Sequence, residues 1–131
     1  MKAISVRQPG ADLIMDGGKV DIRCWKTLHR GKLLIHASGI DWIECHRLGM
    51  DCRNFGALLG AAELVSVKLL SEEDWEKLRD RHLVAGPRPY RKTYGWFYRN
   101  PQRFSVPVPW GGILGLFEVS DEILSARQQS A

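Results

Sequence analysis

The sequence is poor in cysteine. Only three of its 131 residues are cysteine, they are widely spaced, and no CxxC pair occurs. An odd number of cysteines at these spacings argues against a disulfide scaffold. Cys45, His46 and Cys52 resemble part of a zinc site, but a fourth ligand at the spacing of structural zinc sites is missing. The sequence therefore implies no metal and no organic cofactor, and the thiols are expected to be buried or on the surface.

Long apolar runs are also absent. No stretch approaches the roughly 18 apolar residues that a membrane helix needs, and the first residues carry charge too early for a secretory signal. We therefore expect a cytoplasmic protein with no membrane partner. Internal repeats and low-complexity linkers are missing as well, so residues 1–131 are expected to form a single domain. Its core spans about residues 3–120, and 121–131 form a C-terminal helix or tail. The sequence carries no signal for an oligomeric state.

Turn-forming residues are plentiful, with 13 glycines and 6 prolines. Alternating or β-branched patterns predict strands over residues 2–7, 20–25, 32–37, 58–70, 94–99 and 113–119. Asn100 and Pro101 predict a turn. Helices are expected over 11–16, 41–48 and 71–83, the last opened by a capping box from Ser71 to Asp74. These elements predict an α+β fold: a small mixed β-barrel of five to six strands with two to three peripheral helices.

Charge is unevenly distributed along the chain, whose formal net charge is +4. Residues 77–103 contain eight basic residues and one acidic residue, whereas residues 41–76 contain eight acidic and three basic residues. This pattern is compatible with a positive face suited to phosphates and equally with solvated charges that scatter in space.

Polar side chains gather at chain reversals in the first 38 residues. They belong to four short units: Arg7-Gln8-Pro9, Gly17-Gly18-Lys19, Asp21-x-Arg23-x-Trp25 and Ile35-His36-Ala37-Ser38. A plain apolar core would not need these groups. The sequence therefore predicts that this segment forms one wall of a ligand cleft.

The same units, in order, resemble the ASCH family (activating signal cointegrator homology). The segments that match the family pattern are Ile4-Ser5-Val6-Arg7-Gln8-Pro9, Gly18-Lys19 with Asp21-Ile22-Arg23, Arg30 to Ser38, Tyr94-Gly95-Trp96, Pro107-Val108-Pro109 and Leu114-Gly115-Leu116-Phe117. The resemblance implies a barrel related to the pseudouridine-synthase and archaeosine-transglycosylase (PUA) domain, which binds RNA or modified nucleosides. Some family members cleave amide or phosphodiester bonds. Here Asp21 follows Lys19 by two residues instead of three, a spacing that keeps Lys19, Asp21 and Arg23 on one strand face.

Binding of RNA, of single-stranded DNA or of a modified nucleoside is the favoured hypothesis. An unpaired base needs a flat stacking surface, hydrogen bonds to its edge and cations for its phosphates. Expected stacking platforms are Trp25, Tyr94 and Trp96, and expected edge contacts are Gln8, His36 and Ser38. Expected cations are Arg7, Lys19 and Arg23, with Arg88, Arg91 and Lys92 as phosphate contacts. For His36, and for one of Trp96 and Phe97, a place in the core is the alternative.

Hydrolysis is the second hypothesis. Cleavage of an amide such as N4-acetylcytidine, or of RNA, needs a base, a group that orients water and a proton donor. Lys19 is the candidate base if burial lowers its pKa, Asp21 would orient water, and Glu63 would shuttle a proton, although Glu72 and Glu73 compete for that role. The alternative is a surface ion-pair ladder of Lys19, Asp21 and Arg23. A protein-interaction module is the third hypothesis.

Overall fold

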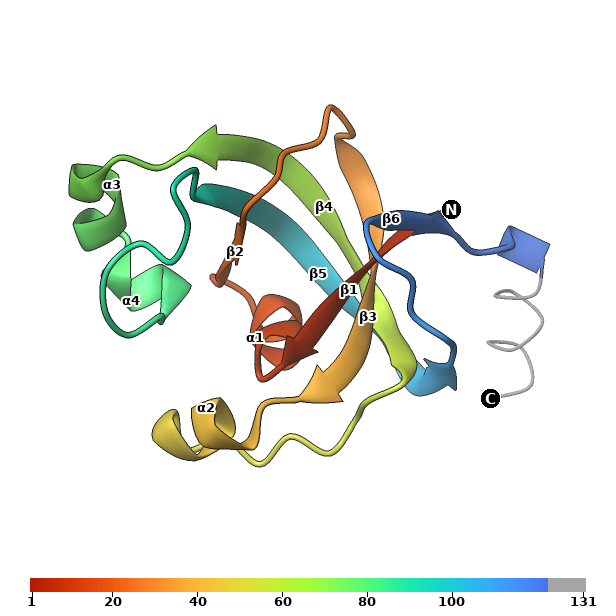
Figure 1. The fold of residues 1–131 in the computed structure, drawn as a ribbon. Coiled ribbons are helices and arrows are strands. Elements are labelled where there is room, and N and C mark those ends of the chain that lie inside the picture. Colours follow the sequence, from red (N-terminus) through yellow and green to blue (C-terminus); the bar gives the residue numbers. More distant parts are fainter. Residues whose placement is uncertain (123–131) are drawn as a thin grey trace.

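The computed structural model describes residues 1–122 and shows an α+β fold (Figure 1). Within that range, six strands form one mixed sheet that is accompanied by four short helices. The strands are β1 (Lys2–Gln8), β2 (Val20–Arg23), β3 (Gly31–Ile40), β4 (Ala57–Leu69), β5 (Tyr94–Pro109) and β6 (Leu116–Glu118); the helices are α1 (Gly10–Asp16), α2 (Trp42–Arg47), α3 (Glu72–Lys77) and α4 (Arg79–His82). The predicted fold class is confirmed, with more helices than expected. The predicted tail lies mostly outside the described residues, and no described helix is long and apolar enough to cross a membrane.

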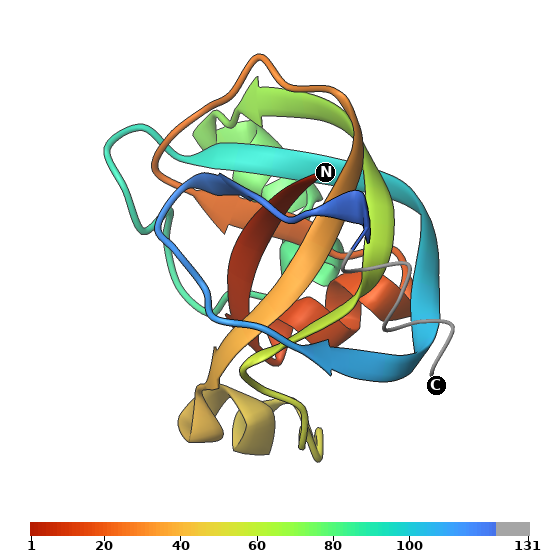
Figure 2. The same ribbon diagram turned by 90° about the vertical axis from the view of Figure 1, so that its right-hand side faces the viewer.

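The sheet is strongly curved but not closed. Its strand order is β2-β5-β4-β3-β1-β6, in which β1 and β3 are parallel and the other neighbours are antiparallel. The two ends, β2 and β6, are four and three residues long, and the described ladders do not join them. A barrel-like curl therefore exists without full closure, as the two views show (Figures 1 and 2).

The main core lies on the side of the sheet that α1 covers. Ala11, Ile14 and Met15 of this helix are buried and join Trp96 of β5 in one apolar cluster. Trp96 is fully buried, and its indole N–H donates to the carbonyl of Trp25 at 3.1 Å. Because α1 follows β1 directly, its packing holds the Gln8-Pro9 corner in place.

β5 is longer than the sequence predicts, and the prediction of a turn at Asn100 and Pro101 is wrong. The strand runs through both residues, with Asn100 at a positive φ of 50°. Ala61 pairs with Gln102 and Glu63 with Arg99, so β5 carries one extra residue here. A β-bulge accommodates that residue and the missing N–H of proline without ending the strand.

The helix expected over 71–83 is interrupted at Leu78 and forms α3 and α4. The predicted capping box is confirmed: the Ser71 hydroxyl accepts from the Asp74 amide, and the Asp74 carboxylate accepts from the Ser71 amide. Leu83 ends α4 in the left-handed conformation, with φ of 62°. The chain reverses there and presents the carbonyls of residues 82–84 to the neighbouring elements.

Candidate nucleoside-binding cleft

A cleft of about 860 Å³ opens beside β1, β2 and β3. The loop after α4 and helix α2 contribute further lining, and so does the segment from Trp110 to Leu114. Seven of the residues singled out in the sequence line it: Arg7, Gln8, Lys19, Asp21, Arg23, His36 and Ser38. The first 38 residues thus supply one wall of the cleft because the parallel pairing of β1 with β3 brings Ser5 opposite His36.

A buried ion pair joins Asp21 to Arg23. Arg23 Nε lies 2.7 Å from Asp21 Oδ2, and the side chains are only 16% and 10% exposed. Arg23 Nη2 donates to the Ser5 carbonyl at 2.8 Å, and the guanidinium carbon lies 5.4 Å from the Trp96 ring centroid. Burial opposes the charge of Arg23, but Asp21 outweighs burial and raises its pKa. Arg23 is therefore a fixed cation on the cleft wall.

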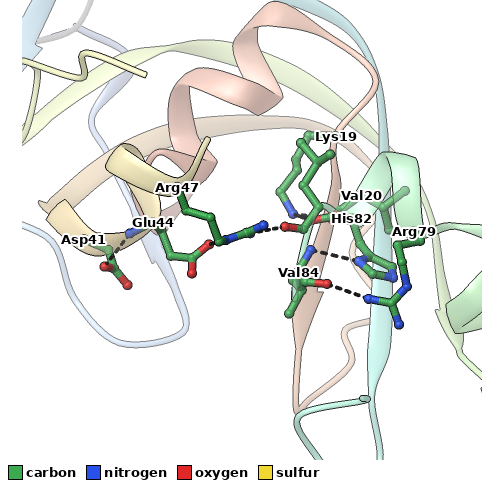
Figure 3. A network of polar contacts seen from close by, with 9 residues as sticks. Lys19, Val20, Asp41, Glu44, Arg47, Arg79, His82 and Val84 are labelled. Carbon is green, nitrogen blue, oxygen red and sulfur yellow. Dashed lines mark hydrogen bonds and ion pairs between the residues drawn. The ribbon is translucent and has the colours of Figure 1, made fainter. Parts of the chain in front are cut away.

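Lys19 is held by backbone oxygens. Its Nζ donates to the Val20 carbonyl at 2.9 Å and makes a shorter contact with the His82 carbonyl (Figure 3). Burial lowers the pKa of Lys19, whereas Asp21 and Glu44 act in the opposite direction. These two carbonyls accept hydrogen bonds from the Lys19 amine in either protonation state. They therefore compete with any ligand for the N–H groups of Lys19.

Three cations bind the carbonyls that end α4. Lys19 donates to His82, Arg47 of α2 donates to Leu83, and Arg79 donates to Val84, the last at 2.9 Å (Figure 3). The last carbonyls of a helix have no partner within the helix and favour positive charge. Arg47 also pairs with Glu44, so this network ties α2 to the loop after α4 across the cleft.

His82, the last residue of α4, is buried and is hydrogen-bonded through both ring nitrogens. The buried ring donates from Nε2 to the Trp75 carbonyl and accepts at Nδ1 from the Val84 amide, so it must be neutral. Burial lowers its pKa, and Lys19 and Arg79 act in the same direction, while the Trp75 carbonyl opposes them. In the unfolded chain, His82 takes up a proton near its ordinary pKa of about 6.5, whereas in the folded chain it does so only at lower pH. Acid therefore favours the unfolded state.

We therefore expect the unfolding midpoint in urea to fall as the pH is lowered from 7.5 to 5.5. In His82→Gln, which cannot titrate, the same change of pH should lower the midpoint less. An equal pH dependence in both proteins would show that His82 is not the group responsible.

Gln8 and His36 are buried and already hydrogen-bonded. The Gln8 side chain donates to the Asn54 carbonyl and accepts from the Asp12 amide. His36 contacts the Ser5 hydroxyl through Nδ1, at 3.0 Å, and the Trp110 carbonyl through Nε2, at 2.6 Å. Arg7 and Ser38 are different: both are exposed at the cleft, and within residues 1–122 neither side chain has a hydrogen-bond or ion-pair partner.

The other predicted residues lie outside the cleft lining. Trp25 and Trp96 pack edge to face with centroids 4.8 Å apart, and Tyr94 packs against the same cluster. Glu63 pairs with Arg99 at 2.7 Å. Arg88 donates to the Leu70 carbonyl and contacts Glu72, whereas Arg91 and Lys92 are exposed.

Several lining residues were not singled out in the sequence. They are Asp41 and Glu44, and Trp110 with the residues that follow it. Asp41 is the N-cap of α2, and this cap signal together with the Gly111-Gly112 step could have drawn attention to two of these segments. The charged lining, Arg7, Lys19 and Arg23 against Asp21, Asp41 and Glu44, is balanced in formal charge.

Within the described part of the chain, potential metal ligands do not cluster. Across residues 1–122 no group of three or more His, Cys, Asp or Glu side chains is placed to hold an ion. Cys45 and Cys52 are buried, and burial, with Cys45 beside it, raises the pKa of Cys52 to about 12. This thiol is therefore protonated at neutral pH.

Fold and cleft together define a small α+β domain with a cleft that charged and apolar side chains both line. Residues 4–108 match the ASCH domain, so the chain belongs to the ASCH family. No curated protein matches the sequence. Among solved structures, the chain resembles ASCH from Zymomonas mobilis, with a TM-score of 0.65 and 15% identity over 98% of this chain and 92% of the other. Two point mutants of that protein give TM-scores of 0.60 and 0.59, also at 15% identity and 98% coverage of this chain, with 96% and 94% of theirs.

Proposed function

We propose that this ASCH domain binds a single base or modified nucleoside, presented by RNA or single-stranded DNA or free in solution. The observation that carries the proposal is the exposed Arg7 guanidinium, which lines a cleft with room for a nucleoside and has no protein partner among the described residues. A cation left without a partner at a cleft is available to an anionic or acceptor group of a ligand.

Other residues in and near the cleft support the same proposal. Tyr90 also lines the cleft, is 45% exposed and offers a ring on which a base can stack. Ser38 adds a hydroxyl without a protein partner, as described above, and Arg91 and Lys92 follow Tyr90 directly in the chain. The balanced charge of the lining favours recognition of the base and its sugar over recognition of several phosphates.

Replacement of Arg7 by alanine is expected to weaken binding of a short labelled single-stranded RNA about tenfold, because a hydrogen bond to a charged group is worth about 1.5 kcal/mol. Fluorescence anisotropy at several salt concentrations measures this change. If Arg7 contacts one phosphate, the slope of log K against log salt should also become shallower by about 0.7.

Arg53→Ala is the matched control. Arg53 is exposed and pairs with Asp51 outside the cleft lining, so its loss changes the net charge equally. Equal affinities of the Arg7 and Arg53 variants would contradict a specific site at Arg7. Absence of RNA binding in the wild type, together with no binding of free nucleosides, would overturn the proposed function.

Hydrolysis through Lys19 is the second candidate, favoured by the burial that lowers the pKa of this amine. Lys19 and Asp21 both line the cleft, and Glu44 is a nearby acid, whereas Glu63 lies elsewhere. Incubation of the wild type and Lys19→Ala with N4-acetylcytidine tests this reaction. Deacetylation should occur and be lost in the variant; equal product from both proteins would remove Lys19 from the mechanism.

A further inference from the structure

Ser5 and His36 form a polar pair on the cleft wall that neither proposed function uses. Ser5 Oγ lies 3.0 Å from His36 Nδ1, and both residues line the cleft. Ser5 is half-buried, and His36 is 1% exposed. The pair is built by the fold, because β1 and β3 run parallel with Ser5 in register with His36.

The state of the ring follows from its second contact. His36 Nε2 lies 2.6 Å from the Trp110 carbonyl oxygen, and a carbonyl can only accept a hydrogen bond. Nε2 must therefore carry the proton, which leaves the lone pair of neutral His36 on Nδ1. The Ser5 hydroxyl consequently donates to Nδ1.

We propose that Ser5 is an activated nucleophile for acyl transfer, with His36 as its general base and the Trp110 carbonyl as the group that orients the ring. A serine within hydrogen-bond reach of a base that a third group orients is the general signature of such a nucleophile. The inference uses the cleft described above but does not rest on nucleic-acid binding.

The reaction balances without a cofactor. Ser5 Oγ forms a bond to the carbonyl carbon of an ester or amide as its proton passes to His36 Nδ1. The bond to the leaving group then breaks, and the proton passes from Nδ1 to the departing oxygen or nitrogen. Water, deprotonated by the same nitrogen, later releases the acid and restores the hydroxyl.

Arg23 and Gly112 border the pair. Arg23 Nη2 donates to the Ser5 carbonyl at 2.8 Å, which fixes a cation beside the backbone of Ser5. At Gly112, a Cβ atom would lie 2.6 Å from Ser5 Oγ and 2.7 Å from His36 Cε1. The Trp110 segment therefore packs directly against the pair, so that its backbone holds the imidazole in position.

Covalent labelling of the full protein tests the proposal. A fluorophosphonate probe should release fluoride and leave a phosphonyl group on Ser5, and 4-nitrophenyl acetate should give a burst of nitrophenolate with an acetyl group on the same residue. Trypsin isolates residues 3–7, in which Ser5 is the single serine, and residues 33–47, in which Ser38 is the single serine. Mass spectrometry of wild-type peptides thus locates each adduct without a variant.

Matched variants test the mechanism. Ser5→Ala should lose both adducts, and His36→Gln should slow both reactions by about 100-fold or more, as expected for loss of a general base. Ser66→Ala removes an exposed serine of β4 that lies outside the cleft lining and should react as the wild type does. Absence of either adduct from peptide 3–7, or equal rates in His36→Gln and the wild type, would overturn the proposal. RNA affinity measured in parallel reports on the proposed function separately, since labelling needs no nucleic acid.

Discussion

Replacement of Arg23 by methionine is expected to lower the free energy of unfolding by about 3–5 kcal/mol, because it leaves a buried charge without its partner. Asp21 is only 7% exposed, and its carboxylate is compensated by Arg23 Nε at 2.7 Å. Methionine keeps much of the side-chain volume against Trp96, so loss of packing contributes little. Urea denaturation followed by tryptophan fluorescence measures the change.

An exposed ion pair on the same sheet provides the control. Arg99 and Glu63 are also 2.7 Å apart, but their side chains are 66% and 38% exposed. Arg99→Met should therefore cost only about 0–1 kcal/mol. The double variant Asp21→Asn with Arg23→Met should recover part of the loss, since it removes both charges. If Arg23→Met were no more destabilising than Arg99→Met, the buried pair would not be a major source of stability.

Substitution of Gly60 by alanine is expected to destabilise the protein by about 3 kcal/mol, the upper part of the range for overpacking. A Cβ atom at this position would lie 2.2 Å from the Gln102 carbonyl oxygen and 2.7 Å from the Arg103 Cα. Both atoms belong to the backbone of β5, so relief requires movement of a strand. The clash falls where the pairing of β4 with β5 shifts register, between Leu58 and Gly60.

Gly39→Ala is the matched control, because it adds the same methyl group to a strand glycine that has open space around it. Gly39 lies in β3, and no atom outside its immediate neighbours lies within 4 Å of the Cβ that alanine would add. Gly39→Ala should change the free energy of unfolding by at most about 0.5 kcal/mol. Thermal and urea unfolding of both variants test the difference. Similar stabilities would mean that β5 yields to the added methyl group at Gly60.

Local patterns along the chain were sufficient for most elements of the fold. Alternation over residues 2–7 and the β-branched residues of 58–70 correspond to β1 and β4, and the Ser71–Asp74 capping box opens α3 as expected. The errors concern β5 and the break at Leu78. A bulge that absorbs Asn100 depends on pairing with β4, so short-range turn signals did not indicate that the strand continues.

The cleft was partly predictable for the same reason. Arg7, Lys19 and Arg23 lie at or next to strand ends, whereas Asp21, His36 and Ser38 lie within β2 and β3; in both places polar side chains stand out against the apolar pattern of a core strand. Their partners were not predictable. Lys19 donates to the carbonyl of His82, which lies 63 positions further along the chain, and His36 contacts the carbonyl of Trp110, 74 positions further along. Every residue has a backbone carbonyl, so the sequence does not indicate which of them a side chain will contact.

The sequence by itself determined the family, the α+β class and the polar wall formed by residues 5–38, because periodicity and motif order are local properties of the chain. The tertiary structure alone decided what each polar group does. Arg23 is a buried partner of Asp21, and Lys19 is bound to carbonyls. Arg7 projects into the cleft without a protein partner among the described residues, and Ser5 faces His36. These roles follow from burial and from contacts between distant segments, which exist only once the curved sheet has formed.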